Sequence, residues 1–553
     1  MSFLEHIHTK GLLASALDRL PAPVADVVHG ASARFHLIVA KLAAVSGLSD
    51  QTVQLIFAAL AVVVFISLLT SKSEAEPLPK GAKLPPHVPT AIPFFGAAVQ
   101  FGVQPIKFLQ ECQAKYGDCF TFTMMGRNMT YCLGPDGNNF GFNIKLAEAS
   151  AEDAYRKLTA PVFGREVVYD VPNPVFMEQK KFIKDSLTTA AFREYISIIA
   201  QETNDFLDSW APKSDSFEIF PAMAELTIRT ASHCLMGSDV RSKLHSEVAI
   251  HYKHLDEGFA PINVFFEWLP LPAYIRRDHA NREMTKLFLD IMKDRRTNNK
   301  SDNYDVLQNL MNSSYKDGKP LTDMEAARLM IALLMAGQHT SSTTTTWILL
   351  HLAQNPKIAQ EIMREQSMVL TGRPDTPADQ LPPLDYDSLR QLTYLDNTMK
   401  ETLRMHSPLH TLMRKVVKNC EFQGYTIPKG HFLCMSPTVS QYDSTRFPDP
   451  ETFDPTRHVN STEGAGEWTI NGVDISQKSA KSHFLPFGAG RHRCIGEAFA
   501  FVQVKTIISM MLRRIQLELP KDKNGKPIFP EADFTSLVVL PKKPCNLSYE
   551  LKK

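Results

Sequence analysis

The residues best suited to chemistry surround one cysteine near the carboxyl end of the chain. The segment Phe487-Gly-Ala-Gly-Arg-His-Arg-Cys494-Ile-Gly496 precedes an apolar run that is expected to be helical. A cysteine at a helix N-terminus lies near the positive end of the helix dipole, and the glycines allow a tight turn whose N–H groups can face sulfur. Arg491 and Arg493 add positive charge. These conditions predict an ionised thiolate, able to bind a metal, beside the apolar wall of Phe487.

Alternative roles for this cysteine follow from its type alone. The chain contains 8 cysteines without a C-x-x-C pair, so neither a disulfide framework nor a zinc ribbon is expected. A glycine-rich turn before a helix can also bind phosphate, but no Gly-Lys-Ser/Thr follows this one. A lone cysteine is usually a structural core residue. The sequence spacing alone therefore leaves two alternatives: one of the cysteines has a chemical role, or all of them are structural.

A second unusual segment lies inside a long helical pattern. Residues 340–346 all carry hydroxyl groups, and such residues are poor helix formers. Gly337 costs up to ~1 kcal/mol relative to Ala in a helix interior. Hydroxyls that bond to carbonyls one turn earlier would give a purely structural explanation. The alternative is a functional groove in this helix.

A third pattern, Glu-x-x-Arg, has the spacing of one helix face. It occurs three times: Glu325/Arg328, Glu361/Arg364 and Glu401/Arg404. The spacing does not distinguish them. Only Glu401 and Arg404 are followed by Phe453-Asp-Pro-Thr-Arg457 and then by the cysteine loop. Exposed ion pairs remain the simplest interpretation of the other two.

The pattern Phe487-x-x-Gly490-x-His492-x-Cys494-x-Gly496 resembles the haem-binding signature of the cytochrome P450 family. The resemblance implies a mainly α-helical fold with a minor β region, a single large haem domain, and haem b with Cys494 as the ligand of its iron. The family pattern has Arg where this chain has His492.

The other two patterns acquire roles from the same resemblance. Ala336-Gly337-x-x-Thr340 is similar to the family's oxygen-binding groove, in which the threonine supplies a proton path to bound dioxygen. The family's buried charged cluster is assigned to three residues: Glu401, Arg404 and Arg457.

One branch of the family is matched more closely, the sterol 14α-demethylases of fungal type. His339 stands where the family normally has an acid, and it occurs together with His492. The segment 155–170 resembles the substrate-recognition segment of this branch, and segments 177–184 and 409–415 also match. The resemblance covers roughly residues 80–550.

Site residues follow by position from the resemblance. The expected ligands of the haem propionates are Tyr155, Tyr169, Lys180, Arg414 and His492, cationic and phenolic donors that suit carboxylates. The expected surroundings of the sterol are Tyr155, Leu158, Thr159, Phe163, Tyr169, Ala336, Gly337, His339 and Thr340. We hypothesise that His339 pairs with Asp256 to relay protons to Thr340.

The implied reaction removes the 14α-methyl group of lanosterol or eburicol in three oxidation rounds, with release of formate, in ergosterol biosynthesis. The chain has no flavin or NADPH motif, so electrons from NADPH are expected through a separate reductase, NADPH–cytochrome P450 reductase. Its expected docking face carries Lys478, Lys481, Arg491 and Arg493. The alternatives are a hydroxylase of another steroid or xenobiotic, and a non-oxidative haem-thiolate isomerase or sterol-binding protein.

The elements that must position these residues are mostly helices. Helical patterns are predicted at 178–210, 218–236, 277–298, 322–354, 355–370, 386–406 and 494–516. Short strand-like runs occur at 119–124 and 537–540. The catalytic domain is expected to span residues 96–553, with a long surface loop at 459–483.

A membrane anchor is predicted ahead of this domain. Residues 51–71 carry no charge, and a helix of this length spans the roughly 30 Å of a bilayer's hydrocarbon core. Residues 1–50 are predicted to lie on the membrane surface and the proline-rich segment 72–95 to form a hinge. Basic residues flank both ends of the span, which leaves its orientation open. The resemblance implies a single pass through the endoplasmic reticulum membrane with the catalytic domain in the cytosol.

The overall charge narrows the range of partners. The chain has 553 residues, with 60 Lys and Arg against 59 Asp and Glu, a net charge of +1. A nucleic-acid-binding protein usually carries a strong basic excess on its binding face. We therefore expect a sterol, a reductase and a lipid bilayer as partners, and no nucleic acid.

Overall fold

The computed structural model describes most of the chain after the predicted anchor. The described residues are 76–90, 94–210, 214–243, 246–259, 271–298, 305–458, 469–470, 473–474 and 479–552. Ala75–Lys553 forms one of two compact units. The predicted surface segment 1–50 and anchor 51–71 lie outside the described residues. Among the helices that are described, none is both long and apolar enough to cross a bilayer.

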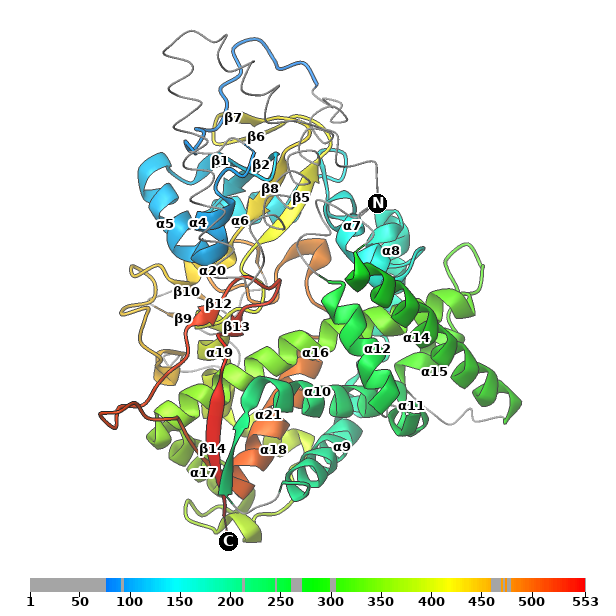
Figure 1. The fold of residues 1–553 in the computed structure, drawn as a ribbon, viewed down its shortest axis with the longest axis vertical. Coiled ribbons are helices and arrows are strands. Elements are labelled where there is room, and N and C mark those ends of the chain that lie inside the picture. The colour runs from blue at the N-terminus through cyan, green and yellow to red at the C-terminus, as the bar shows by residue number, and fades with distance from the viewer. Residues whose placement is uncertain are drawn as a thin grey trace, which may run out of the picture. The chain divides into compact units, whose positions relative to one another are not determined.

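Helices form most of the Ala75–Lys553 unit (Figure 1). The α-helices are α4 (Ala98–Val103), α5 (Pro105–Tyr116), α6 (Gly134–Asn143), α7 (Ala151–Phe163), α8 (Asn173–Lys184), α9 (Thr189–Asp208), α10 (Ile219–Met236), α11 (Ser238–Lys243), α12 (Ser246–Glu257), α14 (Pro272–Thr297), α15 (Val306–Met311), α16 (Asp323–Gln354), α17 (Pro356–Thr371), α18 (Tyr386–Gln391), α19 (Thr393–Met405), α20 (Pro437–Gln441) and α21 (Glu497–Arg514). Short 3-10 turns include η1 (Val168–Asp170) and η4 (Gly490–His492).

The strands are short and gather in small sheets. The main sheet has the order β1-β2-β8-β5-β3, with β1 (Cys119–Met124), β2 (Arg127–Cys132), β8 (Phe432–Met435), β5 (Leu412–Val416) and β3 (Ala149–Ser150). A second sheet has the order β11-β14-β4, with β11 (Ile515–Glu518), β14 (Asn546–Leu551) and β4 (Ser214–Glu218). The remaining pairs are β6 (Cys420–Phe422) with β7 (Tyr425–Ile427), β9 (Thr469–Ile470) with β10 (Val473–Asp474), and β12 (Ala532–Asp533) with β13 (Leu540–Pro541). The expected mainly α fold with a minor β region is confirmed.

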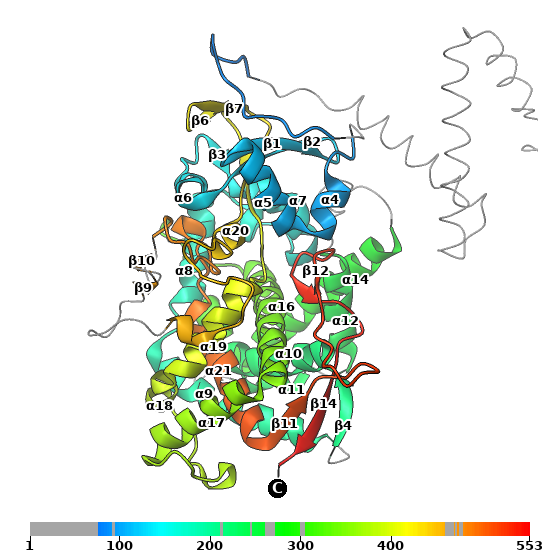
Figure 2. The same ribbon diagram turned by 90° about the vertical axis from the view of Figure 1, so that its left-hand side faces the viewer.

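The long helix α16 lies at the centre of the helical part. Thr322 and Glu325 form a capping box at its N-terminus, which satisfies backbone donors reciprocally. Its side chains are buried along most of its length, and α10, α14 and α21 pack against it. Figure 2 shows α16 between the lobe that contains β1, β2, α4 and α5 and the helices α9, α17 and α18. A helix buried in this way provides a rigid support for a site.

The run of hydroxyl residues does not interrupt α16. The Thr340 hydroxyl donates to the Ala336 carbonyl at 2.9 Å, and the Thr344 hydroxyl donates to the Thr340 carbonyl at 2.8 Å. These bonds satisfy buried hydroxyls within the helix itself. Hydrogen bonds within the helix therefore explain part of the run of hydroxyl residues, and a functional role for Thr340 is compatible with them.

Two predicted helices are each divided in the structure. The expected helix 178–210 is replaced by α8 and α9, because the Thr188 side chain accepts from Ala191 N and starts a new helix. The expected helix 386–406 is replaced by α18 and α19, which meet at Leu392. The strand predicted at 119–124 has the bounds of β1, whereas only Leu540 of the run 537–540 lies in a strand.

Part of the proline-rich segment belongs to the sheet. Val88 N donates to Thr121 O at 2.8 Å, and Thr121 N donates to Pro86 O at 2.8 Å. Val88 is also buried. This stretch is extended, as its prolines predict, and it is held against β1. Most of the predicted loop 459–483 lies outside the described residues.

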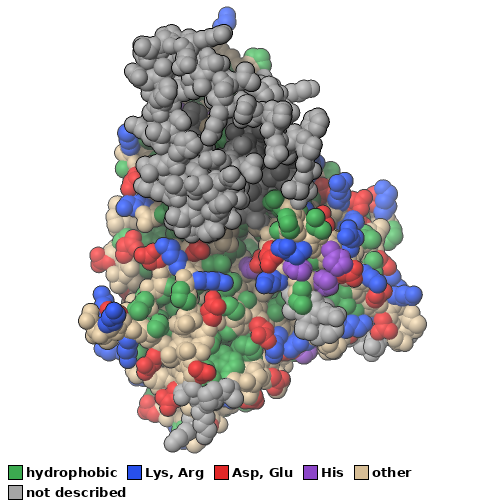
Figure 3. Space-filling view, in the orientation of Figure 1, with side chains coloured by type: hydrophobic (Ala, Val, Ile, Leu, Met, Phe, Trp, Pro, Cys, Tyr) green, Lys and Arg blue, Asp and Glu red, His purple; other side chains and the backbone are tan. Residues whose placement is uncertain are grey.

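Charged side chains of both signs are interspersed over the face shown in Figure 3. The described part of this face mixes basic and acidic side chains. It agrees with the near-zero net charge of +1.

Candidate active site

The cysteine loop is a tight turn that ends before α21. Cys494 N donates to Phe487 O at 3.0 Å, which closes the turn. Gly490 has φ +64°, and a Cβ there would lie 2.7 Å from Phe142 O, so only glycine suits this position. The side chain of Cys494 is exposed, whereas the other seven cysteines are buried. The loop therefore presents one accessible thiol.

The prediction that the protein alone keeps this thiol ionised is wrong. Although the side chain is accessible, the surrounding protein desolvates the thiol and raises the pKa of Cys494 above its ordinary value, while the Gly496 N–H, Lys180 and Arg493 oppose this effect. The helix dipole is also weaker at sulfur than expected, because α21 begins only at Glu497. Arg493 is occupied by an ion pair with Glu497 at 2.6 Å. A metal ion at the sulfur would oppose this desolvation and favour the thiolate.

Open space lies beside the predicted groove of α16. A Cβ added to Gly337 would meet no atom within 4 Å. Ala336 is exposed and Thr340 half-buried, although Met335 and Leu334 beside them are buried. The loop that carries Cys494 leads into α21, which packs against α16. An accessible thiol and an accessible apolar groove on neighbouring elements fit a flat prosthetic group.

The five residues expected to bind propionates lie together. The rings of Tyr155 and Tyr169 are 5.1 Å apart, and those of Tyr169 and His492 are 6.1 Å apart. Tyr155 Oη accepts from Met413 N at 2.8 Å, beside Arg414 on β5. The fifth residue, Lys180, donates to the Arg491 and Arg493 carbonyls at 3.1 and 2.9 Å. Segments far apart in the chain thus form one cluster of donors.

The charges of this cluster suit an anionic ligand. Burial lowers the pKa of His492 to about 3, and the positive charges of Arg414, Lys180 and Arg491 act in the same direction. His492 is therefore neutral, and its buried Nδ1 has no hydrogen-bond partner. Burial also lowers the pKa of Lys180 and raises the pKa values of Tyr155 and Tyr169. A cationic guanidinium and ammonium beside neutral phenols and an unpaired imidazole nitrogen match the carboxylates of haem.

Tyr169 is positioned by a strained turn. Val168 has φ +54°, a conformation that a β-branched side chain rarely adopts. Val168 N donates to Gln179 Oε1 at 2.9 Å, and Gln179 Nε2 donates to Glu166 O at 3.1 Å. The buried amide of Gln179 holds the turn that carries Tyr169, as strained backbone at functional sites requires.

The remaining predicted sterol residues lie on α7. Leu158, Thr159 and Phe163 are all buried. The Thr159 hydroxyl donates to Tyr155 O at 3.1 Å, and the ring of Phe163 stacks on Phe259 at 5.8 Å. Helix α7 also packs against α16. One face of α7 thus faces the protein interior near the groove.

His339 and Asp256 are in contact, as the sequence hypothesis proposed. His339 Nε2 lies 2.9 Å from Asp256 Oδ1, and their side chains are 17% and 45% exposed. The pair joins α16 to the end of α12. The distance is short enough for an ion pair, but the geometry is not that of a hydrogen bond, because His339 Nε2 has no hydrogen-bond partner.

The charged cluster is fully internal. Glu401 and Arg404 are both 0% exposed, with Arg404 Nη2 2.9 Å from Glu401 Oε1. Arg457 Nε donates to the same oxygen at 3.0 Å. Of the other two Glu-x-x-Arg pairs, Glu361 and Arg364 form an exposed ion pair at 3.5 Å.

Several residues around His492 were not found from the sequence. Glu152 Oε1 lies 3.9 Å from His492 Nε2, and the ring of Phe176 lies 5.8 Å from its imidazole. Asn173 Nδ2 donates to Glu152 at 2.7 Å. Asn173 and Phe176 share a face of α8 with Lys180, at i−7 and i−4, so helical spacing could have identified them.

Comparisons with known proteins show which family this chain resembles. The family model "Cytochrome P450" matches residues 86–549. The "Lanosterol 14-alpha demethylase" of Cunninghamella elegans is 44% identical over 85% of this chain and 92% of its own length. That of Bos taurus is 43% identical over 87% and 91%. The "Sterol 14-alpha demethylase CYP51A" of Gibberella zeae is 41% identical over 90% and 99%.

A solved structure supports the fold independently. The retinoic acid-bound cyanobacterial CYP120A1 superposes with a TM-score of 0.70 at 20% identity, over 85% of this chain and 100% of that chain. At this identity the likeness concerns the fold alone. Together with the family match and the relatives, it leads to one conclusion: the chain belongs to the cytochrome P450 family.

Proposed function

We propose that the protein is a sterol 14α-demethylase that acts on lanosterol or the related sterol eburicol in sterol biosynthesis. The observation that carries this proposal is the 44% identity, over 85% of this chain, with a relative named lanosterol 14-alpha demethylase. The reaction removes the 14α-methyl group in three oxidation rounds and releases formate. Two residues that resemble this branch of the family support the proposal: His339, which lies 2.9 Å from Asp256, and His492, whose ring lies 6.1 Å from that of Tyr169.

Cys494 is the residue proposed to hold haem iron. The loop fixed by the Cys494 N to Phe487 O bond presents its thiol. Tyr155, Tyr169, Lys180, Arg414 and His492 are proposed to bind the propionates. When bound, haem supplies the activation of dioxygen that oxidises the methyl group. Cations and neutral donors in one buried cluster support this assignment, because charge-assisted hydrogen bonds to carboxylates are strong.

The chain itself orients the sterol and moves protons. Leu158 and Phe163 on α7, with Ala336 on α16, are proposed to form apolar walls that place the methyl group and exclude water. Gly337 leaves room for the ligand, since nothing lies within 4 Å of its missing Cβ. His339 is proposed to accept a proton from the surface through Asp256 and to deliver it to the Thr340 hydroxyl.

Electrons are proposed to come from NADPH through a separate reductase that docks near the cysteine loop. Of the expected basic face, Lys481 is 63% exposed and lies 3.8 Å from Asp136. Arg493 is paired with Glu497, and Arg491 donates to Ile144 O. Lys478 lies outside the described residues. We also propose attachment to the endoplasmic reticulum membrane, which the apolar segment 51–71 supports.

Two optical titrations test the proposal. Reduced protein with carbon monoxide should give the strongly red-shifted Soret band of thiolate-bound haem, and Cys494→Ala should abolish it. Lanosterol or eburicol should shift the ferric wild-type protein toward high spin. A Soret band without the red shift would refute Cys494 as the ligand. A spectrum unchanged by both sterols would refute the proposed substrate.

A further inference from the structure

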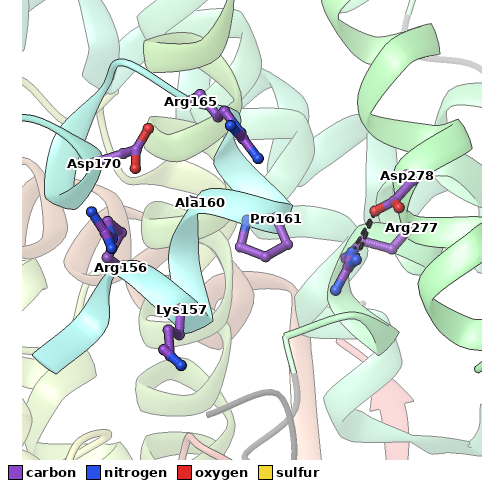
Figure 4. A pocket seen from close by; sticks show the side chains of 8 residues that line it. All are labelled: Arg156, Lys157, Ala160, Pro161, Arg165, Asp170, Arg277 and Asp278. Carbon is purple, nitrogen blue, oxygen red and sulfur yellow. Dashed lines mark hydrogen bonds and ion pairs between the residues drawn. The ribbon is translucent and has the colours of Figure 1, made fainter. Parts of the chain in front are cut away.

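A cationic pocket lies on the outer side of α7, where that helix approaches α14. Its volume is about 600 Å³. Figure 4 shows Arg277 and Asp278 of α14 on one side, and residues of α7 and the following loop on the other. The lining residues are Arg156, Lys157, Ala160, Pro161, Arg165, Asp170, Arg277 and Asp278.

The lining carries more positive than negative charge. Four side chains are cationic and two are acidic. Both acids already have partners: Asp278 pairs with Arg277, and Asp170 accepts from Glu166 N at 2.9 Å. Arg156 and Arg165 are exposed. The pocket therefore has an excess of two positive charges and suits an anion.

Arg277 is the best-placed donor in this pocket. Its side chain is only 6% exposed. Nε donates to Asp278 Oδ1 at 2.8 Å, and Nη2 lies 2.7 Å from the same oxygen. The remaining nitrogen, Nη1, is buried without a hydrogen-bond partner. A buried N–H that lacks an acceptor is costly, and an anion in the pocket would supply one.

The position of this guanidinium is fixed by its surroundings. It lies 4.7 Å from the centre of the Tyr274 ring. The aliphatic part of Arg277 passes so close to Gly258 that a Cβ there would lie 2.4 Å from its Cδ. A donor held in place before binding loses little conformational entropy when a ligand arrives.

We propose that this pocket binds a phosphate group, with Arg277 Nη1 donating to one oxygen and the arginines of the opposite wall meeting others. A guanidinium matches the geometry of a phosphate, whose several oxygens can accept from two helices at once. Its charge of about −1.5 to −2 near neutral pH offsets most of the excess of two positive charges. The group comes either from free phosphate or from the headgroup of a phosphomonoester lipid. This site is separate from the proposed reaction, so neither test depends on the other.

Calorimetric titration of the full-length haem-loaded protein with inorganic phosphate tests the proposal, with sodium chloride of equal ionic strength as the reference. Wild type should bind phosphate saturably. Arg277→Gln should weaken binding about tenfold or more, because hydrogen bonds to charged groups contribute strongly. Arg276→Gln is the matched control: this neighbour on α14 is 47% exposed and pairs with Glu257 outside the pocket. Its affinity for phosphate should equal that of wild type.

A second variant and a second ligand complete the test. Arg165→Gln replaces an exposed arginine of the pocket, so the variant should fold normally. It should weaken phosphate binding about threefold. Dihexanoyl phosphatidic acid binds more tightly than inorganic phosphate if the source is a lipid headgroup, and no more tightly if it is free phosphate. Absence of saturable binding for both ligands would overturn the proposal. So would wild-type affinity for phosphate in Arg165→Gln and in any folded Arg277→Gln.

Discussion

At the scale of single residues, side chains of the same type have different surroundings in this site, both among the cysteines and among the histidines. Cys494 is accessible while seven cysteines are buried. His492 is buried and neutral among cations, whereas His339 is paired with a half-exposed carboxylate. The buried environment of His492 suits a neutral hydrogen-bonding group.

The proposed proton relay predicts a specific effect of His339→Ala. Demethylation should fall about 10²-fold, the typical contribution of a positioned proton donor, and more of the NADPH consumed should end as peroxide. The reduced carbon monoxide spectrum should not change, because Cys494 is intact. His279→Ala, an exposed histidine on α14, is the control and should behave as wild type. Wild-type turnover and coupling in His339→Ala would contradict the relay.

The buried charged cluster predicts a contrast between two arginines with the same local spacing. Arg404→Ala removes the closest cation of the buried Glu401 carboxylate, although Arg457 and the Asp454 N–H still contact it, and should cost about 3–5 kcal/mol of unfolding free energy. Arg364→Ala removes an exposed pair, 62% and 55% accessible, and should cost less than about 1 kcal/mol. Urea unfolding measures both. Equal losses would show that burial does not determine the strength of this interaction.

Buried histidines predict that the protein loses stability in mild acid. Burial lowers the pKa of His410 from 6.5 to about 4. The unfolded chain therefore binds a proton at higher pH than the folded chain, and stability falls as the pH drops from about 6.5 to about 4. His410→Gln should reduce this loss by up to about 3 kcal/mol, as measured by urea unfolding at several pH values. Because burial lowers the pKa of His431 in the same way, part of the loss should remain. A pH profile identical to that of wild type would contradict the assignment.

At the scale of elements, α16 combines a structural and a ligand-facing role. Its capping box and buried flanks make it rigid, and the open space beside Gly337 lies in the middle of its length. The hydroxyl of Thr340 is held by the Ala336 carbonyl at 2.9 Å. Any proton transfer through Thr340 must therefore compete with a hydrogen bond inside the helix.

Gly337→Ala separates these two roles. Because the added Cβ meets no atom within 4 Å, the helix should gain about 0.5–1 kcal/mol of stability. The same methyl group occupies the space proposed for ligand, so the sterol-induced high-spin shift should weaken. Gly102→Ala in α4 is the matched control, since its Cβ also meets nothing within 4 Å; it should leave the shift unchanged. Thermal unfolding and sterol titration of both variants provide the measurements. Undiminished sterol affinity in Gly337→Ala would contradict the placement of the ligand.

At the scale of the whole molecule, local patterns were easier to predict than long-range contacts. The strand β1 and the helices α10, α16 and α17 lie close to the predicted ranges, because each is encoded by its own periodicity and caps. The break between α8 and α9 depends on the side chain of Thr188, and the helical pattern predicted for residues 178–210 continued across this position. The pocket at Arg277 and the raised pKa of Cys494 depend on segments packed from distant parts of the chain. Such packing is not visible in the linear sequence.

The activity proposed for the protein is demethylation of a 14α-methyl sterol at the Cys494 site. The most direct test is product analysis by mass spectrometry, with the haem-loaded protein, a reductase, NADPH, oxygen and lanosterol. A sterol 14α-demethylase should yield a sterol that lacks the 14α-methyl group and has a 14,15 double bond, with formate in the same molar amount. A hydroxylated sterol that retains the methyl carbon as the final product, without formate, would contradict it.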